Sequence, residues 1–310
     1  MYNQVLEQIQ RSSHVVLISH INPDGDALGS SLALYLAILK LGKKVTICNS
    51  TKEIAKKFDF LPSFNKIKNT LPSRYDLLIS CDCGSFDRLG IKRVEVPIIN
   101  IDHHKSNTEY GTINVVDRDS PSTTMVVFSM LESFKIKMDS KIATCIYTGI
   151  VEDTDFFVNQ NTDKDVFEIS AKLIDYGVDS SKVAYNLLQR ESLAKIRLKA
   201  ILINSIELKQ NAKVGIGIIR QEDLHRCGAM RSDCDNLINI IRSLVTVEIA
   251  ILLIEEKNLE FKVSLRSKTA DVESIATKFD GGGHHYASGF QSNILDSKEL
   301  IDKILYEVKI

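Results

Sequence analysis

The chain has 310 residues, of which 39 are Lys or Arg and 40 are Asp or Glu, so its formal net charge is -1. Because domains usually span roughly 100–200 residues, this length favours two domains. With 44% hydrophobic and 25% charged residues, the composition excludes collagen-like, disordered and disulfide-scaffold proteins. The near-neutral charge argues against a general duplex-DNA binder, although it is compatible with a short anionic ligand at a local site.

The six cysteines have no zinc-finger spacing, which is typical of reduced thiols in a cytosolic protein. The N-terminal segment carries charges and lacks a signal-peptide core. No apolar run reaches the roughly 18 residues that a membrane span needs. We therefore expect a cytoplasmic protein without a membrane partner.

The first half alternates between strand-like and helix-like stretches. Short apolar runs predict strands at His14–His20, Lys44–Asn49, Asp76–Asp82 and Val96–Asp102. Helical periodicity predicts helices at Asp26–Gly42, Ser122–Phe134 and Ser140–Ile150. Near-continuous apolar strands separated by helices are typical of a parallel sheet that is covered on both faces.

The pattern stays helical from Asp163 to about Lys209 and then changes character. Strands are predicted at Ala212–Arg220, Val247–Glu255 and Glu260–Lys268, and helices at Asp233–Leu244, Asp271–Phe279 and the C-terminus. The expected fold is α/β. It has an N-terminal parallel-sheet domain over residues 1–190, a linker helix over 191–211 and a smaller C-terminal α/β domain over 212–310.

Ionisable residues follow three of the four strands predicted in the first half. The segment His20-Ile-Asn-Pro-Asp24-Gly-Asp26 follows the first strand, Asp82 ends the third, and Asp102-His103-His104 ends the fourth. In an open parallel sheet the carboxyl ends of the strands lie along one edge, where such folds bind ligands. We therefore expect these side chains to converge in space.

Carboxylates gathered at one edge repel one another unless a cation neutralises them. Mixed imidazole and carboxylate ligands suit Mn²⁺ or a similar divalent ion. There are more ligands than one ion with open positions would take, so we predict two divalent ions. Such a pair, about 3.5–4 Å apart and bridged by a carboxylate, favours in-line attack on a phosphoryl group. The expected ligands are His20, Asp24, Asp26, Asp82 and His103.

Ordinary structural roles compete with this interpretation. Asp26 could be only a helix N-cap, Asp24-Gly25 only a turn, and His20 a hydrogen-bonded strand end. Asp-His-His at a strand end is harder to explain in this way, because three ionisable side chains need partners there. Ser122-Thr123-Thr124 is most simply a helix cap, although a helix N-terminus near the site could also meet phosphate.

A further acidic cluster lies in Gly149-Ile-Val-Glu-Asp-Thr-Asp155, at the end of a predicted apolar helix. Its end could deliver a carboxylate to the site. Glu152, Asp153 and Asp155 all qualify, and spacing alone does not choose among them. Solvation of the helix end is the competing explanation.

In the second domain, Gly281, Gly282 and Gly283 precede His284 and His285. Consecutive glycines let backbone N–H groups converge on an anion, and the two His residues can donate to the same phosphate. Arg266 falls on the polar face of a predicted strand, where its guanidinium can bind phosphate or simply be solvated.

These patterns resemble the ordered motifs of the DHH phosphoesterase superfamily. The resembling segments are His20-x-x-Pro-Asp24-Gly-Asp26, Asp82, Asp102-His103-His104 and Gly-Ile-Val-Glu-Asp153-Thr. Gly281-Gly-Gly-His284 with Ala287-Ser-Gly289 is similar to the signature of the DHH-associated C-terminal domain. Length and layout resemble the nanoRNase/pAp phosphatase branch, bacterial enzymes that degrade very short RNAs and adenosine 3′,5′-bisphosphate (pAp). RecJ-type exonucleases are much longer, and membrane-bound cyclic di-AMP phosphodiesterases carry further domains.

The resemblance implies a role for each residue. One metal ion would be held by His20, Asp24 and Asp82, and the other by Asp26, Asp82, His103 and Asp153. Asp82 would bridge the ions, and Asp153 is selected over Glu152 and Asp155. His104 would contact the scissile phosphate, while Asp102 would orient the histidines. The substrate's terminal phosphate or nucleotide would be bound by Arg266, the glycine loop and His284.

The sequence departs from the family pattern at two positions. Asp155 and Asp280 stand where the family usually has Gly. Extra acid near either phosphate site would weaken anion binding or shift metal preference, and we expect His285 to offset part of the charge of Asp280. These departures bear on substrate preference more than on catalysis.

The resemblance therefore predicts a Mn²⁺-dependent hydrolase acting on short single-stranded RNA and on pAp. The alternatives are a soluble cyclic di-AMP or pApA phosphodiesterase, a pyrophosphatase, and a catalytically silent nucleotide sensor. Retention of every expected ligand disfavours the sensor. A homodimer and a monomer are both compatible with the sequence.

Overall fold

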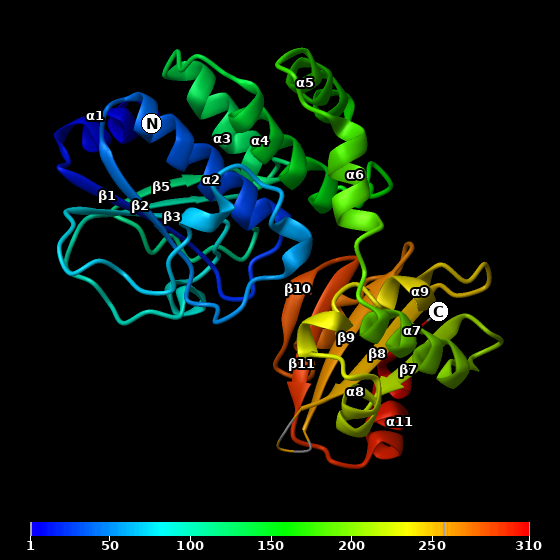
Figure 1. Ribbon diagram of the computed structural model, residues 1–310. Coiled ribbons are helices and arrows are strands. Elements are labelled where there is room, and N and C mark those ends of the chain that lie inside the picture. Colours follow the sequence, from blue (N-terminus) through cyan, green and yellow to red (C-terminus); the bar gives the residue numbers. More distant parts are fainter. Residues whose placement is uncertain (1, 257, 259, 310) are drawn as a thin grey trace. The chain divides into compact units, whose positions relative to one another are not determined.

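The computed structural model describes residues 2–256, 258 and 260–309. The chain divides into two compact units, residues 1–190 and residues 191–310. Each combines a β-sheet with helices, so the predicted α/β class is confirmed (Figure 1). None of the helices in the described residues has the length and apolar character to cross a membrane.

The first unit is built on a five-stranded sheet in the order β2-β1-β3-β4-β5. All neighbouring strands are parallel. The strands are β1 (His14–Ser19), β2 (Lys44–Cys48), β3 (Leu77–Cys81), β4 (Ile98–Asp102) and β5 (Ile113–Val116). The sequence predicts the first four. β5 was missed because it is a short edge strand with Asn114 among its apolar residues.

Six α-helices follow or precede these strands. They are α1 (Tyr2–Arg11), α2 (Gly25–Lys40), α3 (Thr123–Ser133), α4 (Ser140–Asp153), α5 (Lys164–Asp175) and α6 (Ser180–Leu188). Alternate residues of β1 face opposite cores: Val15 and Leu17 pack with the helices, whereas Val16 and Ile18 pack against Phe86 and Leu89. Those two residues belong to the 3-10 turn η3 (Phe86–Leu89). The second face of the sheet is thus covered by a 3-10 turn and loops rather than by long helices.

Helices α2 and α4 approach each other very closely, and this contact positions the site. A Cβ atom at Gly29 would collide with the backbone carbonyl oxygen of Cys145. A Cβ atom at Gly149 would lie 2.7 Å from Oδ1 of Asp26. Glycine permits this approach because it has no side chain. The C-terminal end of α4 is therefore held beside the first turn of α2.

The second unit contains a six-stranded mixed sheet in the order β10-β11-β9-β8-β7-β6. Only the β7–β8 pair is parallel among the strands described. The strands are β6 (Glu207–Lys209), β7 (Val214–Ile219), β8 (Ile249–Glu255), β9 (Phe261–Ser267), β10 (Gly282–His284) and β11 (Ala287–Ser292). Two helices cover one face, α10 (Glu273–Thr277) and α11 (Ser297–Glu307), and three cover the other, α7 (Leu193–Ser205), α8 (Gln221–Cys227) and α9 (Ile238–Arg242).

The helical stretch around the expected linker differs from the prediction. It is broken into α5, α6 and α7, each of which starts at its own side-chain N-cap. Where a linker helix was expected up to residue 211, α7 ends at Ser205 and β6 begins at Glu207. Leu198 and Leu202 of α7 are buried in a core of the second unit. The polar caps that break the stretch resemble ordinary helix-surface residues in the sequence.

The helix predicted over Asp233–Leu244 is also shorter than expected. The 3-10 turn η4 (Arg231–Cys234) comes first, and α9 follows after a break. Asn236 lies in the left-handed region with φ 64°, which a continuous helix does not allow. Asn tolerates this conformation better than most residues, so it ends one turn and permits the next to start.

Candidate metal centre

The segment after β1 brings three of the predicted ligands to the start of α2. Asp24 is the N-cap of this helix and accepts a hydrogen bond from the backbone N–H of Ala27. Asp26 is buried in the first turn and accepts from the N–H groups of Thr123 and Thr124, at 2.6 and 2.9 Å. The capping role considered for Asp26 is therefore wrong for α2. Its carboxylate instead meets the N-terminus of α3, whose N–H groups favour a negative charge.

Asp82 occupies the centre of the cluster. It follows β3 directly, is 2% exposed and has φ 54°. A non-glycine residue in this left-handed conformation costs on the order of 1–3 kcal/mol, and such strain concentrates at functional sites. One carboxylate oxygen, Oδ2, lies 3.5 Å from Nε2 of His20, and the other, Oδ1, lies 3.7 Å from Nε2 of His103. Thr123 donates its hydroxyl to Oδ1 at 2.9 Å.

Backbone carbonyls fix the orientation of both of these imidazoles. Nδ1 of His20 lies 2.8 Å from the carbonyl of Ile21, and Nδ1 of His103 lies 3.1 Å from the carbonyl of Ser120. Because a carbonyl only accepts, Nδ1 is the protonated nitrogen in each neutral ring. The lone pair of Nε2 then faces the carboxylates, which is the usual arrangement of a metal-ligating histidine.

Asp102 organises the loop that follows β4. This fully buried carboxylate accepts from Nδ1 of His104 at 2.7 Å, from the backbone N–H of His103 at 2.8 Å and from the side-chain amide of Asn107. Burial acts to raise the pKa of Asp102, but the hydrogen bond from His104 and its charge outweigh burial and lower that pKa. Asp102 therefore remains ionised and orients the His104 ring.

The structure separates the three acidic residues at the end of α4. Oδ2 of Asp153 lies 3.4 Å from Nε2 of His103. Glu152 turns to the other side, where it accepts from the backbone N–H of Gly25 and pairs with Lys57 at 2.6 Å. Asp155 follows the helix in the left-handed region with φ 48°. Asp153 therefore has an oxygen atom in the cluster, and its selection as a metal ligand stays a prediction.

All six residues predicted to hold metal come together in three overlapping groups. In each group one nitrogen or oxygen atom per residue lies within 4.8 Å of the others. The groups are His20 with Asp24 and Asp82, Asp26 with His103 and Asp153, and Asp82 with His103 and His104. Asp82 and His103 each occur in two groups. Donors of this kind, drawn from separate strand and helix ends, form a centre that fits divalent cations.

The electrostatics of the cluster also favour a cation. Burial, followed by repulsion from Asp82, raises the pKa of Asp26 to about 7. Burial likewise raises the pKa of Asp153 well above its ordinary value. Burial acts to lower the pKa of His103, but the charges of Asp153, Asp82 and Asp26 outweigh it and raise that pKa to about 9. Protons thus compensate the crowded carboxylates, and a divalent cation would do so more completely.

Some of the residues that shape this centre were not recognised from the sequence. Thr123, interpreted simply as part of a cap, contacts both Asp26 and Asp82. Asn107 and Lys57 belong to no recognised motif. Lys57 contacts a residue that is distant in the sequence, and the contact of Asn107 with Asp102 depends on the conformation of the loop between them. The polar Ser122-Thr123-Thr124 segment at the start of a predicted helix was the sequence signal that could have indicated this role.

In the second unit, the predicted glycine loop is a strand. Gly282–His284 forms β10, an edge strand paired with β11. His284 is opposite Ala287, which is opposite Arg266 on β9, so Arg266 and His284 belong to one cross-strand row. Neighbouring strands lie about 4.8 Å apart, which puts the two backbones about 10 Å apart on the same face.

Close packing explains two of the three glycines in this hairpin. A Cβ atom at Gly281 would collide with Phe290, and one at Gly283 would meet the backbone of Ser288 at 2.6 Å. A Cβ atom at Gly282 would enter open space. Because β10 is an edge strand, its alternate N–H groups point away from β11. Any role of these groups in anion binding therefore involves an open strand edge rather than a flexible loop.

His285 has a different partner from the one expected. Its Nδ1 lies 3.5 Å from Oδ1 of Asp271, and its carbonyl accepts from the N–H of Val272. Asp280, whose charge it was expected to offset, precedes the strand with φ 57°. The pairing follows from the turn after β10, which places His285 beside the segment leading into α10.

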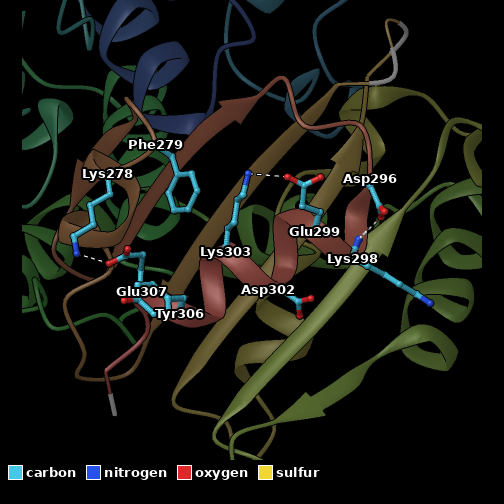
Figure 2. A pocket seen from close by; sticks show the side chains of 9 residues that line it. All are labelled: Lys278, Phe279, Asp296, Lys298, Glu299, Asp302, Lys303, Tyr306 and Glu307. Carbon is cyan, nitrogen blue, oxygen red and sulfur yellow. Dashed lines mark hydrogen bonds and ion pairs between the residues drawn. The ribbon is translucent and has the colours of Figure 1, made fainter.

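A surface hollow on the second unit has a different character. It is lined by α11 together with Lys278 and Phe279 (Figure 2). Two of its three lysines have acidic partners: Lys278 pairs with Glu307, and Lys303 pairs with Glu299 at 2.7 Å. Part of the charge in the hollow is therefore compensated locally, and none of the potential metal-ligand groups found among the described residues lies there.

The fold and the site define a two-domain α/β protein whose parallel sheet carries, at its carboxyl edge, acidic and histidine side chains positioned for metal ions. Residues 14–150 match the model of the DHH family, N-terminal domain, and residues 224–309 match that of the DHHA1 domain. The chain therefore belongs to the DHH family of phosphoesterases and is a hydrolase.

Three known proteins illustrate the likeness. A bifunctional oligoribonuclease and PAP phosphatase NrnA from Thermus thermophilus is 28% identical over 298 residues, covering 95% of this chain and 89% of that protein. The crystal structure of an exopolyphosphatase-related protein from Bacteroides fragilis superposes with a TM-score of 0.87 at 22% identity, covering 99% of this chain and 94% of the other. RecJ from Thermus thermophilus, crystallised in complex with Mn²⁺, gives a TM-score of 0.57 at 12% identity, covering 99% of this chain and 53% of RecJ. The two structural likenesses concern the fold.

Proposed function

We propose that this protein is a Mn²⁺-dependent phosphoesterase that hydrolyses short oligoribonucleotides to mononucleotides and removes the 3′-phosphate of pAp. The similarity to an oligoribonuclease and PAP phosphatase over nearly the whole chain supports the substrate class. The observation that carries the chemistry is Asp82, whose two carboxylate oxygens face the Nε2 atoms of His20 and His103 separately.

The proposed ligand sets follow from this central position. One ion would be held by His20, Asp24 and Asp82, and a second by Asp26, Asp82, His103 and Asp153. Nitrogen and oxygen donors without thiolate suit Mn²⁺, the ion present in the RecJ complex. Bound there, divalent cations would supply Lewis acidity and a water of lowered pKa.

Residues around this centre would orient the phosphate. We assign His104 to contact with the scissile phosphate, because Asp102 holds its ring from the Nδ1 side. With Nδ1 donating to Asp102, Nε2 can donate to phosphate only when the ring is protonated. Burial opposes this protonation, but the hydrogen bond to Asp102 and the charge of Asp82 outweigh burial and raise the pKa of His104. A protonated donor fixed in this way stabilises charge that develops in the transition state. In the second unit, the row formed by Arg266, Ala287 and His284 would bind a terminal phosphate or nucleotide, together with Gly281 and the glycines of the edge strand β10 that follows it.

The function is tested with purified protein in Mn²⁺ and, in parallel, in EDTA. The substrates are pAp, pApA, cyclic di-AMP, pyrophosphate and labelled RNAs of about two to ten nucleotides, a range that probes the binding of a short strand. We expect Mn²⁺-dependent turnover of pAp and of the shortest RNAs. Preference for cyclic di-AMP or pApA would reassign the substrate, and turnover of pyrophosphate alone would contradict the family branch. Binding without turnover of any substrate would identify a sensor.

The proposed metal centre also predicts two opposite effects of pH. Raising the pH should destabilise the protein in EDTA but increase its affinity for Mn²⁺. In EDTA, the raised pKa of Asp26 (about 7, against 3.8) gives stability that is present below 3.8 and lost as pH rises towards 7. The raised pKa of His103 (about 9, against 6.5) gives stability that is lost between 6.5 and 9. Because Mn²⁺ must displace these protons, its affinity rises over the same range.

We therefore expect the increase in Tm caused by Mn²⁺ to be larger at about pH 8 than at about pH 6. Differential scanning calorimetry at both pH values, with and without the ion, measures this increase. Mg²⁺ at the same concentration serves as the comparison ion. An increase that is constant, or that shrinks at the higher pH, would contradict the proposed proton displacement.

A further inference from the structure

Glu152 makes two contacts beside the metal centre. It is the penultimate residue of α4, next to the proposed ligand Asp153, and its side chain is only 15% exposed. One carboxylate oxygen, Oε2, accepts the backbone N–H of Gly25, and the other, Oε1, lies 2.6 Å from Nζ of Lys57. Each oxygen therefore has its own partner, in a different segment of the first unit.

The contact with Gly25 reaches the segment that carries two proposed ligands. Gly25 lies between Asp24 and Asp26 and is the first residue of α2, where backbone N–H groups have no partner within the helix. Asp24 accepts the N–H of Ala27, so carboxylates from two different helix ends cap the same N-terminus. A Cβ atom at position 25 would collide with the Glu152 carboxylate, which rests directly against the backbone.

Lys57 neutralises the charge of the Glu152 carboxylate beside the proposed ligands. An additional negative charge beside the proposed ligands would increase their mutual repulsion. The ammonium group of Lys57 cancels that charge, and it is itself held 4.6 Å from the ring centre of Phe58. Lys57 and Phe58 both belong to the 3-10 turn η1 (Lys56–Phe58) that follows β2. The ion pair therefore connects η1, α4 and the start of α2.

We propose that Glu152 is a positioning residue of the metal centre. It fixes the Asp24-Gly25-Asp26 segment against the end of α4, and so sets the spacing between the ligands on α2 and Asp153. Lys57 holds the carboxylate in place and neutralises it. Asp24 depends most on this support, because its side chain is 52% exposed. The inference rests on the proposed function, since it concerns ligands of the proposed ions.

The test measures Mn²⁺ binding to the metal-free protein by isothermal titration calorimetry, with Tm in EDTA recorded for each variant. We expect Glu152→Ala to bind Mn²⁺ about 10–100-fold more weakly, the usual cost of losing a residue that orients metal ligands. Glu152→Gln keeps an oxygen that accepts the Gly25 N–H, so its affinity should stay within about threefold of wild type. The matched control is Glu132→Ala, at an exposed carboxylate on α3.

A second measurement adds a side chain at position 25, which is a glycine in this protein. Gly25→Ala displaces the Glu152 carboxylate and should weaken Mn²⁺ binding by itself. In the Glu152→Ala background the collision is gone, so the added cost of Gly25→Ala should be several-fold smaller, which a double-mutant cycle measures. Additive costs would contradict the contact.

The outcomes separate the inference from the function on which it rests. If Glu152→Ala lowers Tm in EDTA but keeps its Mn²⁺ affinity within about twofold, Glu152 is structural and the inference fails. If Glu152→Gln loses as much affinity as Glu152→Ala, charge rather than positioning is responsible, and the inference also fails. If the wild-type protein binds no Mn²⁺, the proposed metal centre itself is wrong.

Discussion

Asp82→Asn is expected to reduce phosphoester hydrolysis by on the order of 10³-fold or more while leaving the protein folded. The carboxylate of Asp82 faces His20 through one oxygen and His103 through the other. It is therefore the one acidic side chain proposed to serve both ions. Losing its charge removes several kcal/mol of stabilisation of the reacting centre, and each 1.36 kcal/mol corresponds to a factor of ten in rate.

Asn is the appropriate replacement because of the backbone conformation. At φ 54°, Ala would be strained, whereas Asn tolerates the left-handed region. The amide oxygen of Asn can still accept the hydroxyl of Thr123. Turnover of pAp at saturating Mn²⁺ measures the loss, and circular dichroism checks the fold. Asp165→Asn, at an exposed carboxylate on α5, should retain full activity. Near-normal turnover by Asp82→Asn would remove the bridging role.

The second large effect is expected for His104→Asn. The Asn side chain can place its amide nitrogen near the position of Nδ1 and keep the hydrogen bond to Asp102, while the rest of the ring is lost. We expect kcat to fall about 10²–10³-fold, as it does when one donor to a developing oxyanion is removed. The affinity for Mn²⁺ should stay within about twofold of wild type.

The comparison of the two variants distinguishes their roles. Asp82→Asn should lose both metal affinity and turnover, whereas His104→Asn should lose turnover alone. His104 also forms a potential ligand group with Asp82 and His103. A large loss of Mn²⁺ affinity in His104→Asn would therefore assign it to the metal and not to the phosphate.

The convergence of the predicted ligands could be inferred from the general topology of parallel sheets. The runs that form β1, β3 and β4 are almost purely apolar, so a parallel sheet was predictable, and with it the shared edge at which His20, Asp82 and Asp102 lie. Local sequence patterns did not predict the regular elements that are short or rich in glycine. The edge strand β10, for example, has glycine at two of its three positions and resembles a loop in the sequence.

The supporting contacts could not be predicted, because they depend on how helices pack. Glu152 and Gly25 are 127 positions apart, and Thr123 and Asp82 are 41 apart. Nothing in the local sequence around Glu152 distinguishes its direction from that of Asp153. The difference arises because successive helix residues point about 100° apart, and because the approach of α2 to α4 through Gly29 determines which direction faces the cluster.

The proposed ligands extend along the chain from His20 to Asp153, and the last of them belongs to the final residue of α4. A nascent polypeptide emerging from the ribosome therefore lacks at least one proposed ligand until about half of the protein has been synthesised. Shorter pieces, whether unfinished or produced by proteolysis, cannot assemble the full set of donors. The proposed hydrolysis would thus begin only after all five strands of the N-terminal sheet have been made.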